Sequence, residues 1–383
     1  MTTNPLSPDA QAVVEQIKRE LDEGVRPGRP RLRVAFIGPS RVGKTTMLLT
    51  MLSVFLQRFR TGREQTAGDF PRLELKPEDH QPTAAISNDA LLNRLRAKLA
   101  RFTSPDEDLP RELFDEAVRP SKTLSYYRYR FNVVNGVGTE IPIRMADMPG
   151  SWFNNVNGWE WEATAALCEL CDVLVVPVDV PALMSGNRDI MEMRNAPTAL
   201  RSLFQYLSAR DVRGDAGGWL VIFVPLRCER WRWADHPDAQ GDPDWSAKQS
   251  RRMFEEVDRA YADVVSVIRE KWSDSKFAVT PVETLGSVHH HHFENDDDGF
   301  HSVFRKKAAD ASVEGVDTDQ PVLHMITRLL AEQELNRPRL FQQGCVHNWF
   351  YGVRGDIRRA AELVRRRTKG IDGGPADDGF GYL

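Results

Sequence analysis

The feature that most constrains this chain is the loop GPSRVGKT at residues 38–45. An apolar run of strand length, LRVAFI at 32–37, precedes it, and a helical stretch at about 44–58 follows it. Glycines allow a tight turn in which backbone N–H groups and the next helix N-terminus face one point. The loop fits the pattern G-x-x-x-x-G-K-[ST] through Gly38, Gly43, Lys44 and Thr45. A buried strand, this loop and a helix in that order predict a phosphate-binding loop, or P-loop, in an α/β domain.

Each polar group of this loop has an expected role. Lys44 is expected to reach the β and γ phosphates of a nucleoside triphosphate, and the Thr45 hydroxyl to ligate Mg²⁺. The alternative interpretation, a glycine-rich turn with an exposed lysine, predicts no ligand. Nucleotide contacts are expected from Gly38, Ser40, Arg41, Val42, Gly43, Lys44, Thr45 and Thr46.

Further along the chain, the apolar pattern predicts a mostly parallel sheet. Two runs rich in aromatic and β-branched residues, 124–134 and 141–145, are joined by hairpin-turn residues and should pair antiparallel. After them, short continuous apolar strands alternate with helical stretches, which is typical of an α/β fold with helices on both faces of the sheet. The strands are expected at 173–178, 219–224 and 277–279, and the helices at 161–170, 197–207, 247–271 and 320–334.

These elements predict one main domain with an extension at each end. Residues 1–30 are expected to form a helical appendage. The P-loop domain is expected to span 31–334, with a helical insertion at about 59–120 and a His/Asp-rich loop at about 287–300. Residues 335–383 are expected to form a basic helix and a disordered tail.

Charge and composition narrow the choice of partners. The formal net charge of -4 over 383 residues gives no general attraction to nucleic acid or acidic membranes. No apolar stretch approaches the roughly 20 residues of a membrane span, and the N-terminus lacks the features of a secretory signal, so a cytoplasmic location is expected. Cys168 and Cys171 have no second cysteine pair at zinc-site spacing and are interpreted as buried thiols rather than metal ligands.

A second motif, DMPG, closes the strand IPIRMA with Asp147 and Gly150. Alone it is a weak signal, because Pro-Gly often marks a plain turn. At the carboxyl end of a strand next to the P-loop strand, Asp147 can meet the Mg²⁺ water shell and the Gly150 amide can meet the γ-phosphate.

GPSRVGKT, DMPG and the strand order, over about residues 31–334, resemble the translation-factor-related GTPases, the class that includes Ras-like and dynamin-like proteins. The resemblance implies a Ras-like core with insertions, with GTP or GDP and Mg²⁺ as ligands. In that class a switch threonine closes over Mg²⁺ and the γ-phosphate, and Thr123 matches its place, with Ser121 and Ser125 as rivals. The implied metal ligands are Thr45, Thr123 and Asp147.

Base recognition matches the class less well. Where the class carries [NT]-K-x-D to read guanine, this chain has Leu226, Arg227, Cys228 and Glu229. Arg227 is expected to stack its aliphatic stem on the base, and Glu229 to supply the carboxylate from one methylene further out. Guanine is favoured over adenine on this basis, and ATP stays open. In the later loop that touches the base in this class, Glu283 and Thr284 match only in position.

The residues expected to act in hydrolysis are Arg41, Lys44 and Thr123. Ser151 and Trp152 stand where Ras-like enzymes carry the glutamine that orients the attacking water, so slow hydrolysis is expected. Arg41 occupies the position where guanylate-binding proteins carry an internal arginine finger, which is worth about 10³ to 10⁵ in rate. In the competing interpretation, Arg41 points to solvent or pairs with an acid of the switch.

The leading hypothesis is a GTP-binding switch whose segments around Thr123 and Asp147 to Trp152 are read by a protein partner. The divergent base motif and the insertion resemble the bacterial double-GTPase-like group, which implies a role in conflict or defence systems. Two alternatives remain. One is an ATP-using P-loop ATPase or kinase, and the other is a nucleotide-locked interaction module with negligible turnover, which fits Ser151.

Three other segments carry chemistry of their own. His289 to His292 could bind a transition metal weakly, but four consecutive residues cannot all converge on one ion at defined geometry, so a solvated loop is expected. The stretch 354–369 is expected to be a helix on the domain, with RNA, an acidic partner or anionic lipid as the alternative. A tryptophan cluster is expected to cap the domain, with a partner surface as the alternative: Trp231, Trp233 and Trp245.

Overall fold

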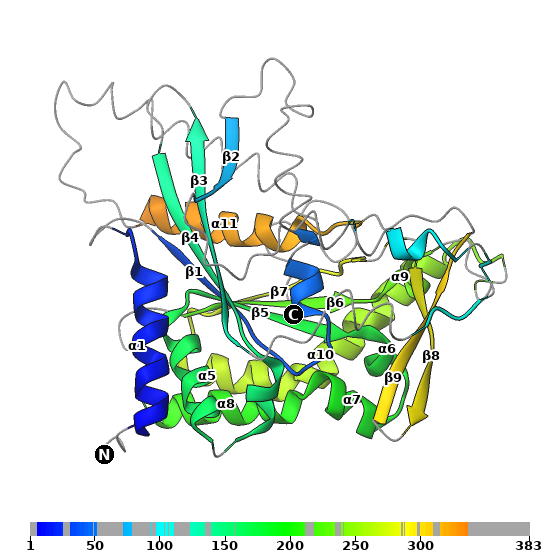
Figure 1. Cartoon of the computed structure of the whole chain (residues 1–383), viewed down its shortest axis with the longest axis horizontal. Coiled ribbons are helices and arrows are strands. Elements are labelled where there is room, and N and C mark those ends of the chain that lie inside the picture. The colour runs from blue at the N-terminus through cyan, green and yellow to red at the C-terminus, as the bar shows by residue number, and fades with distance from the viewer. Residues whose placement is uncertain are drawn as a thin grey trace.

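The fold is α/β and is built on one central sheet, as Figure 1 shows. In this computed structural model, the residues described are 6–25, 31–48, 50–51, 72–78, 93, 97–102, 104–105, 107–110, 123–134, 139–156, 158–210, 218–233, 239, 241–284, 286, 288–296, 299–308 and 315–335.

The central sheet has seven strands in the order β2-β3-β4-β1-β5-β6-β7. From β4 to β7 all neighbours are parallel, whereas β3 pairs antiparallel with β4, and β2 pairs antiparallel with β3. This arrangement confirms the predicted mostly parallel sheet and the antiparallel pair before it, and it is compatible with a P-loop GTPase-like fold. The strands are β1 (Leu32–Phe36), β2 (Arg72–Pro77), β3 (Ser125–Val134), β4 (Thr139–Asp147), β5 (Val173–Asp179), β6 (Leu220–Leu226) and β7 (Lys276–Val279).

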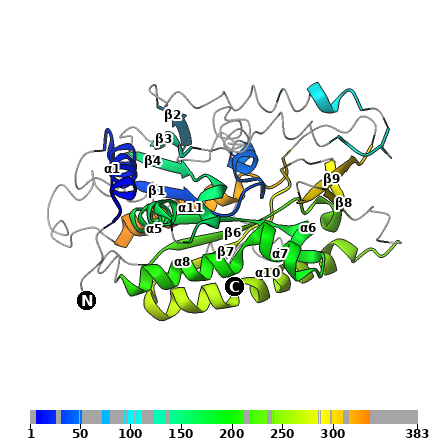
Figure 2. The same ribbon diagram turned by 60° about the horizontal axis from the view of Figure 1, so that its bottom comes forward.

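The strands in the middle of the sheet are apolar throughout because both faces are covered. Every residue of β5 and β6 is buried, which is the burial expected of parallel strands between two helical layers. The layers are visible in Figure 2, where α8 and α10 lie below the sheet. The helices are α1 (Pro8–Asp22), α5 (Trp159–Leu170), α6 (Val180–Met184), α7 (Arg188–Asn195), α8 (Pro197–Ala209), α9 (Glu229–Arg232), α10 (Trp245–Lys271) and α11 (Gln320–Leu335), with the 3-10 helix η1 (Gly150–Asn154).

Two hydrophobic clusters hold these layers together. The larger one joins one face of the sheet to α1, α5, α8 and α10. The other joins the opposite face to α11 and to the helix after the P-loop, through Met47, Leu48 and Met51. The P-loop helix is therefore fixed on the sheet by apolar side chains one turn after the phosphate-binding residues.

Helix α1 is packed into the larger cluster, with Ile17 and Leu21 fully buried there. Polar contacts add to this packing, because Arg128 of β3 pairs with Glu20 at 2.5 Å and also with Glu23. The Arg144 side chain of β4, which is buried, donates to the Glu23 carbonyl at 2.9 Å. The helix predicted within residues 1–30 is thus observed, and it shares its core with the sheet.

One expectation about a loop is wrong, and the expected helical insertion contains a strand as well. The expected His/Asp-rich loop at about 287–300 contains strands β8 (Val288–Asp296) and β9 (Gly299–Lys306), which form an antiparallel hairpin. Part of the expected helical insertion at about 59–120 is strand β2, whose sequence RLELKP alternates apolar and polar residues as an edge strand does. Most of that insertion, and the basic segment at 354–369, lie outside the described residues.

Two residues of the tryptophan cluster follow the carboxyl end of β6: Trp231 lies in α9 and Trp233 directly after it. Trp231 packs against a buried cluster of Val180, Cys228 and Met253, and Lys307 lies 4.6 Å from the centre of the Trp233 ring. These contacts favour the interpretation of the cluster as a cap.

Among the described residues, no helix has both the length and the apolar character that crossing a bilayer requires.

Candidate functional site

The P-loop adopts a conformation that its glycines make possible. Gly43 has φ +104°, and a Cβ atom there would lie 3.3 Å from the Leu226 side chain, so this position favours glycine on both counts. Arg41, which has a side chain, also has a positive φ of 65° and is exposed. The loop lies between β1 and a helix described at residues 44–48 and 50–51. The predicted strand, loop and helix are therefore present in order.

The Lys44 ammonium is folded back over its own loop. It donates to the carbonyl oxygens of Gly38 and Pro39, both at 2.8 Å. Burial lowers the pKa of Lys44 from 10.5 to about 8, and the nearby Asp147 carboxylate opposes this shift. A cation removed from water in this way is stabilised by an anion that enters the loop.

The Thr45 hydroxyl and Asp147 meet, although they are 102 residues apart. Thr45 Oγ1 donates to Asp147 Oδ2 at 2.7 Å, and Asp147 is fully buried at the end of β4. Burial raises the pKa of Asp147, while Lys44 and Thr45 act in the opposite direction. Within the described part of the chain, Asp147 Oδ1 is buried and accepts no hydrogen bond. An unused carboxylate oxygen beside a hydroxyl suits Mg²⁺, which prefers oxygen ligands. The residues here fit the expected ion.

Gly150 brings the second motif directly against the P-loop. A Cβ atom on Gly150 would lie 2.3 Å from the Ser40 backbone nitrogen and 2.6 Å from the Pro39 carbonyl carbon. Only a residue without a side chain permits this approach. The P-loop and the DMPG segment are therefore in backbone contact.

The segment after Gly150 is anchored by aromatic side chains. Trp152 and Phe153 are buried in the larger hydrophobic cluster, and the Trp152 ring lies 5.2 Å from that of Trp159 in an edge-on arrangement. Ser151, at the position where the Ras-like proteins that the sequence resembles carry a glutamine, is exposed. The backbone of this segment is thus held in place while the Ser151 side chain faces solvent.

The expected switch threonine lies at the start of β3. Thr123 is exposed and lies two residues before the strand, and Ser125, its rival, is the register partner of Asp147. Ser121, the other rival, lies outside the described residues. Both described candidates are therefore close in the chain to the point where β3 meets the expected magnesium ligand.

Arg227 connects the end of β6 to the P-loop. Its guanidinium donates to the Arg41 carbonyl oxygen at 2.8 Å and pairs with Asp179 Oδ2 at 2.8 Å. It also lies 5.5 Å from the centre of the Phe304 ring and 3.3 Å from Ser302 Oγ, both in β9. Arg227 has φ 59°, so its backbone turns sharply after the strand. The base-recognition segment expected from the sequence is held next to the phosphate loop by this side chain.

Asp179 is the site residue that sequence reasoning missed. It is fully buried at the carboxyl end of β5, and its backbone N–H donates to Asn195 Oδ1 at 2.6 Å. The signal was present, because an acid that directly ends a continuous apolar strand lies at the edge where ligands bind in α/β sheets. Asp179 belongs to no motif, and its ion-pair partner Arg227 is 48 residues away.

The remaining base-recognition candidates are all buried, and Glu283 lies in an ion-pair network. Glu229 begins α9 and is fully buried. Glu283 pairs with Arg232 at 3.2 Å, and Arg232 pairs with Asp317 at 2.8 Å. Thr284 is also buried. The structure thus brings together the P-loop, Asp147 and Gly150, with Arg227 tied to them, whereas Glu283 contributes to an ion-pair network.

Comparisons with known proteins leave this site to be interpreted from its own residues. No protein-family model and no curated protein matches the chain. One similar solved structure is the GTPase-like domain of Ski7 from S. cerevisiae, bound to GTP, with a TM-score of 0.30 and 13% sequence identity. The match covers 66% of this chain and 43% of that one, so it spans less than half of the Ski7 chain. Membership of the double-GTPase-like group stays a prediction.

Proposed function

We propose that this protein binds a guanine nucleoside triphosphate with Mg²⁺ at the P-loop, hydrolyses it slowly and uses the bound state as a conformational switch. The observation that carries the proposal is the convergence of Lys44, Thr45 and Asp147, in which a buried cation lies beside a hydroxyl and a buried carboxylate. A buried charge is costly unless it is paired, so this group favours a ligand that brings both phosphate and a divalent cation.

Each residue has a role that follows from its position. Lys44 exchanges the Gly38 and Pro39 carbonyls for phosphate oxygens, which are stronger acceptors for an ammonium group. Thr45 and Asp147 hold Mg²⁺ directly or through its water ligands, with Asp147 Oδ1 as the unused oxygen. When bound, Mg²⁺ neutralises charge on the phosphates.

Guanine specificity is proposed to depend on the segment after β6. Because Arg227 donates to the Arg41 carbonyl, this segment lies where a base attached to the bound phosphates can be reached. The stem of Arg227 is proposed to contact the base, and Glu229 to supply a carboxylate for it.

The test of this function is a competition between GTP and ATP for the purified protein, with and without Mg²⁺. We expect GTP to displace a fluorescent guanine nucleotide and ATP to fail at the same concentration. Tight ATP binding without GTP binding would overturn the choice of base and favour the ATP-using enzyme.

Asp147→Asn tests the metal part of the site separately. It keeps the side-chain shape but removes the charge. We therefore expect at least a tenfold loss of nucleotide affinity when Mg²⁺ is present. When a chelator has removed the metal, the affinity should equal that of wild type. Thr45→Ser, which keeps the hydroxyl, serves as the matched control and should retain affinity within about threefold. Equal Mg²⁺ dependence in wild type and Asp147→Asn would contradict the assignment.

A second candidate function is supported by Ser151. Its exposed side chain stands where a water-orienting glutamine is expected, and this favours a module that binds nucleotide without turning it over. Phosphate release under single-turnover conditions separates the two functions. Release that follows first-order kinetics and needs Mg²⁺ supports slow hydrolysis, and its absence over several hours supports the non-hydrolysing module.

A further inference from the structure

The hairpin of β8 and β9 contains an irregularity within its run of histidines. His290 pairs with Phe304 and His292 pairs with Val303, so His291 is an extra residue in β8 without its own register partner. Consecutive side chains of a regular strand point to opposite faces, and a bulge re-aims them. Because of this bulge, two adjacent histidines of the run can face one point, in a strand rather than in the solvated loop expected from the sequence.

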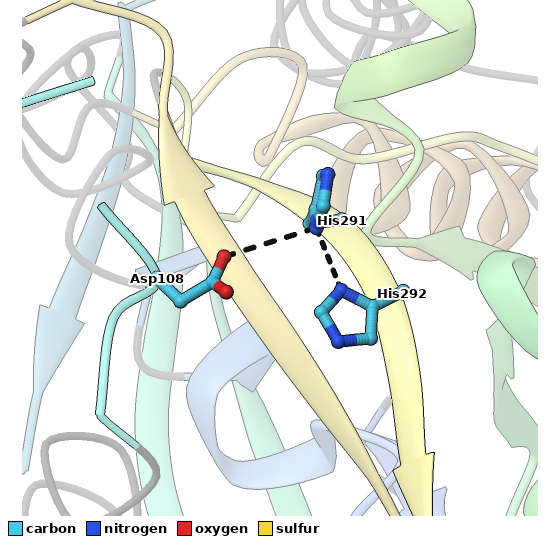
Figure 3. A group of neighbouring side chains, drawn as sticks. All are labelled: Asp108, His291 and His292. Carbon is cyan, nitrogen blue, oxygen red and sulfur yellow. Dashed lines mark hydrogen bonds and ion pairs between the residues drawn. The ribbon is translucent and has the colours of Figure 1, made fainter. Parts of the chain in front are cut away.

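Three side chains converge at this bulge, as Figure 3 shows. The Nδ1 atoms of His291 and His292 lie 2.6 Å apart, and His291 Nδ1 lies 3.8 Å from Asp108 Oδ1. When one potential ligand atom is taken from each of the three residues, all three atoms lie within 4.8 Å of one another. In a tetrahedral zinc site, with zinc–ligand distances of about 2.0–2.2 Å, neighbouring ligand atoms are about 3.3 Å apart. Side-chain shifts below about 1 Å would therefore bring these three to ligating distance.

Glu294 holds one of the histidines in the form that binds metal. His292 Nε2 lies 3.3 Å from Glu294 Oε1, and His301 Nε2 lies 3.2 Å from Glu294 Oε2. A carboxylate at this position accepts a hydrogen bond from Nε2–H and favours the tautomer with the lone pair on Nδ1, the atom that faces His291. Metal-ligating histidines usually have such a carboxylate on the other ring nitrogen.

Asp108 comes from a distant part of the chain that pairs with β9. The Leu109 N–H donates to the Phe304 carbonyl at 2.8 Å, and Arg305 Nε donates to Asp108 Oδ1 at 2.6 Å. These contacts place the carboxylate beside the histidines before any ion binds. A run of histidines in an unfolded chain would have no such third ligand.

The charges around the cluster are mixed. Arg305 lies against Asp108, and Arg230 donates to the His291 carbonyl at 3.2 Å, so two cations oppose metal binding while Asp108 and Glu294 favour it.

We propose that Asp108, His291 and His292 form a binding site for a divalent transition metal of the zinc class, with Glu294 as the residue that orients His292. Two imidazoles and a carboxylate are the donor set of a zinc site with an open fourth position, which water fills. The ion joins the hairpin to the segment around Asp108 and Leu109. This site shares no residue with the P-loop, Asp147 or Gly150.

The experiment is a Zn²⁺ titration of the full chain in competition with a chromophoric chelator, without nucleotide and with excess Mg²⁺ to occupy oxygen-rich sites. We expect wild type to bind one equivalent, and Asp108→Asn and His292→Ala to bind at least tenfold more weakly. His289→Ala is the matched control, because His289 belongs to the same run but packs against Trp233, 5.2 Å between rings. It should bind within twofold of wild type. Glu294→Gln is expected to fall in between, about three- to tenfold weaker.

Two outcomes would overturn the proposal. The first is wild-type affinity in Asp108→Asn, and the second is an equal loss in His289→Ala and His292→Ala, which would identify binding by the histidine run alone. If a substitution reduces the folded fraction, hydrogen exchange of the wild type with and without Zn²⁺ decides the question. Protection at both 107–110 and 288–296 supports the site, and protection limited to 289–292 contradicts it.

Discussion

The contact between Gly150 and the P-loop predicts that Gly150→Ala disturbs nucleotide binding without touching a nucleotide-binding side chain. The added methyl carbon would lie 2.3 Å from Ser40 N and 2.4 Å from Ser40 Cα. Ordinary van der Waals contact for such an atom begins near 3.4 Å, so the two backbone segments must separate by about 1 Å. The atoms in the way belong to the backbone, and they cannot rotate aside as a side chain would.

The size of the effect follows from that displacement. Overpacking of a close-packed interior costs about 1–3 kcal/mol in the free energy of unfolding. Anchoring of Trp152 and Phe153, two and three residues further on, in the core prevents the Gly150 segment from relieving the clash alone. The P-loop must then move, and about 1–3 kcal/mol lost from the binding-competent position of the loop corresponds to roughly 5- to 150-fold in affinity. We expect a loss of about 10- to 100-fold in affinity for a non-hydrolysable GTP analogue.

Calorimetric titration with the analogue measures the affinity, and urea unfolding of the nucleotide-free protein measures the stability. Ser151→Ala is the matched control, because it changes the adjacent exposed residue and should leave both quantities within error of wild type. If Gly150→Ala binds the analogue within twofold of wild type and unfolds at the same urea concentration, the backbone contact between Gly150 and Ser40 does not exist as described.

Three further predictions follow from the charges of the site. Because burial lowers the pKa of Lys44 to about 8, against 10.5 in the unfolded chain, the unfolded state binds more protons between these values. The free energy of unfolding of the nucleotide-free protein should therefore rise across this pH window, by on the order of 3 kcal/mol, and Lys44→Met should lack that rise in urea titrations. Arg227→Ala leaves Asp179 buried without its cation and should lower the free energy of unfolding by about 3 kcal/mol. Arg201→Ala, which breaks an exposed ion pair at 2.9 Å, should lower it by about 0–1 kcal/mol. Equal losses in urea unfolding would contradict the role of the buried pair. Arg41→Ala should lower steady-state GTP turnover at least tenfold with little change in affinity, and equal turnover would remove the arginine-finger hypothesis.

The parts of the site that the sequence predicted are those that depend on local patterns. The P-loop is specified by its own residues, and Asp147 could be placed beside it because parallel strands end at the same edge of a sheet. The meeting of Thr45 and Asp147 follows from these two facts together.

The parts that sequence reasoning missed depend on pairing between distant segments. Nothing near Asp179 in the chain indicates that Arg227 will reach it, because that contact requires the turn after β6 to adopt a positive φ. The arrangement of the histidines was not predicted for a different reason. The run was expected to be a solvated loop, and the bulge at His291 becomes visible only when β8 is paired with β9.

The packing of α1 has a practical consequence for anyone who joins this domain to another protein. Removing residues 1–25 would uncover the apolar surface that Ile17 and Leu21 cover and would remove Glu20 and Glu23, which pair with Arg128. A fusion partner or affinity tag at this end therefore belongs ahead of Ser7, whose hydroxyl caps α1 and donates to Glu162 of α5 at 2.8 Å. Trimming the chain to the start of β1 should yield protein that aggregates.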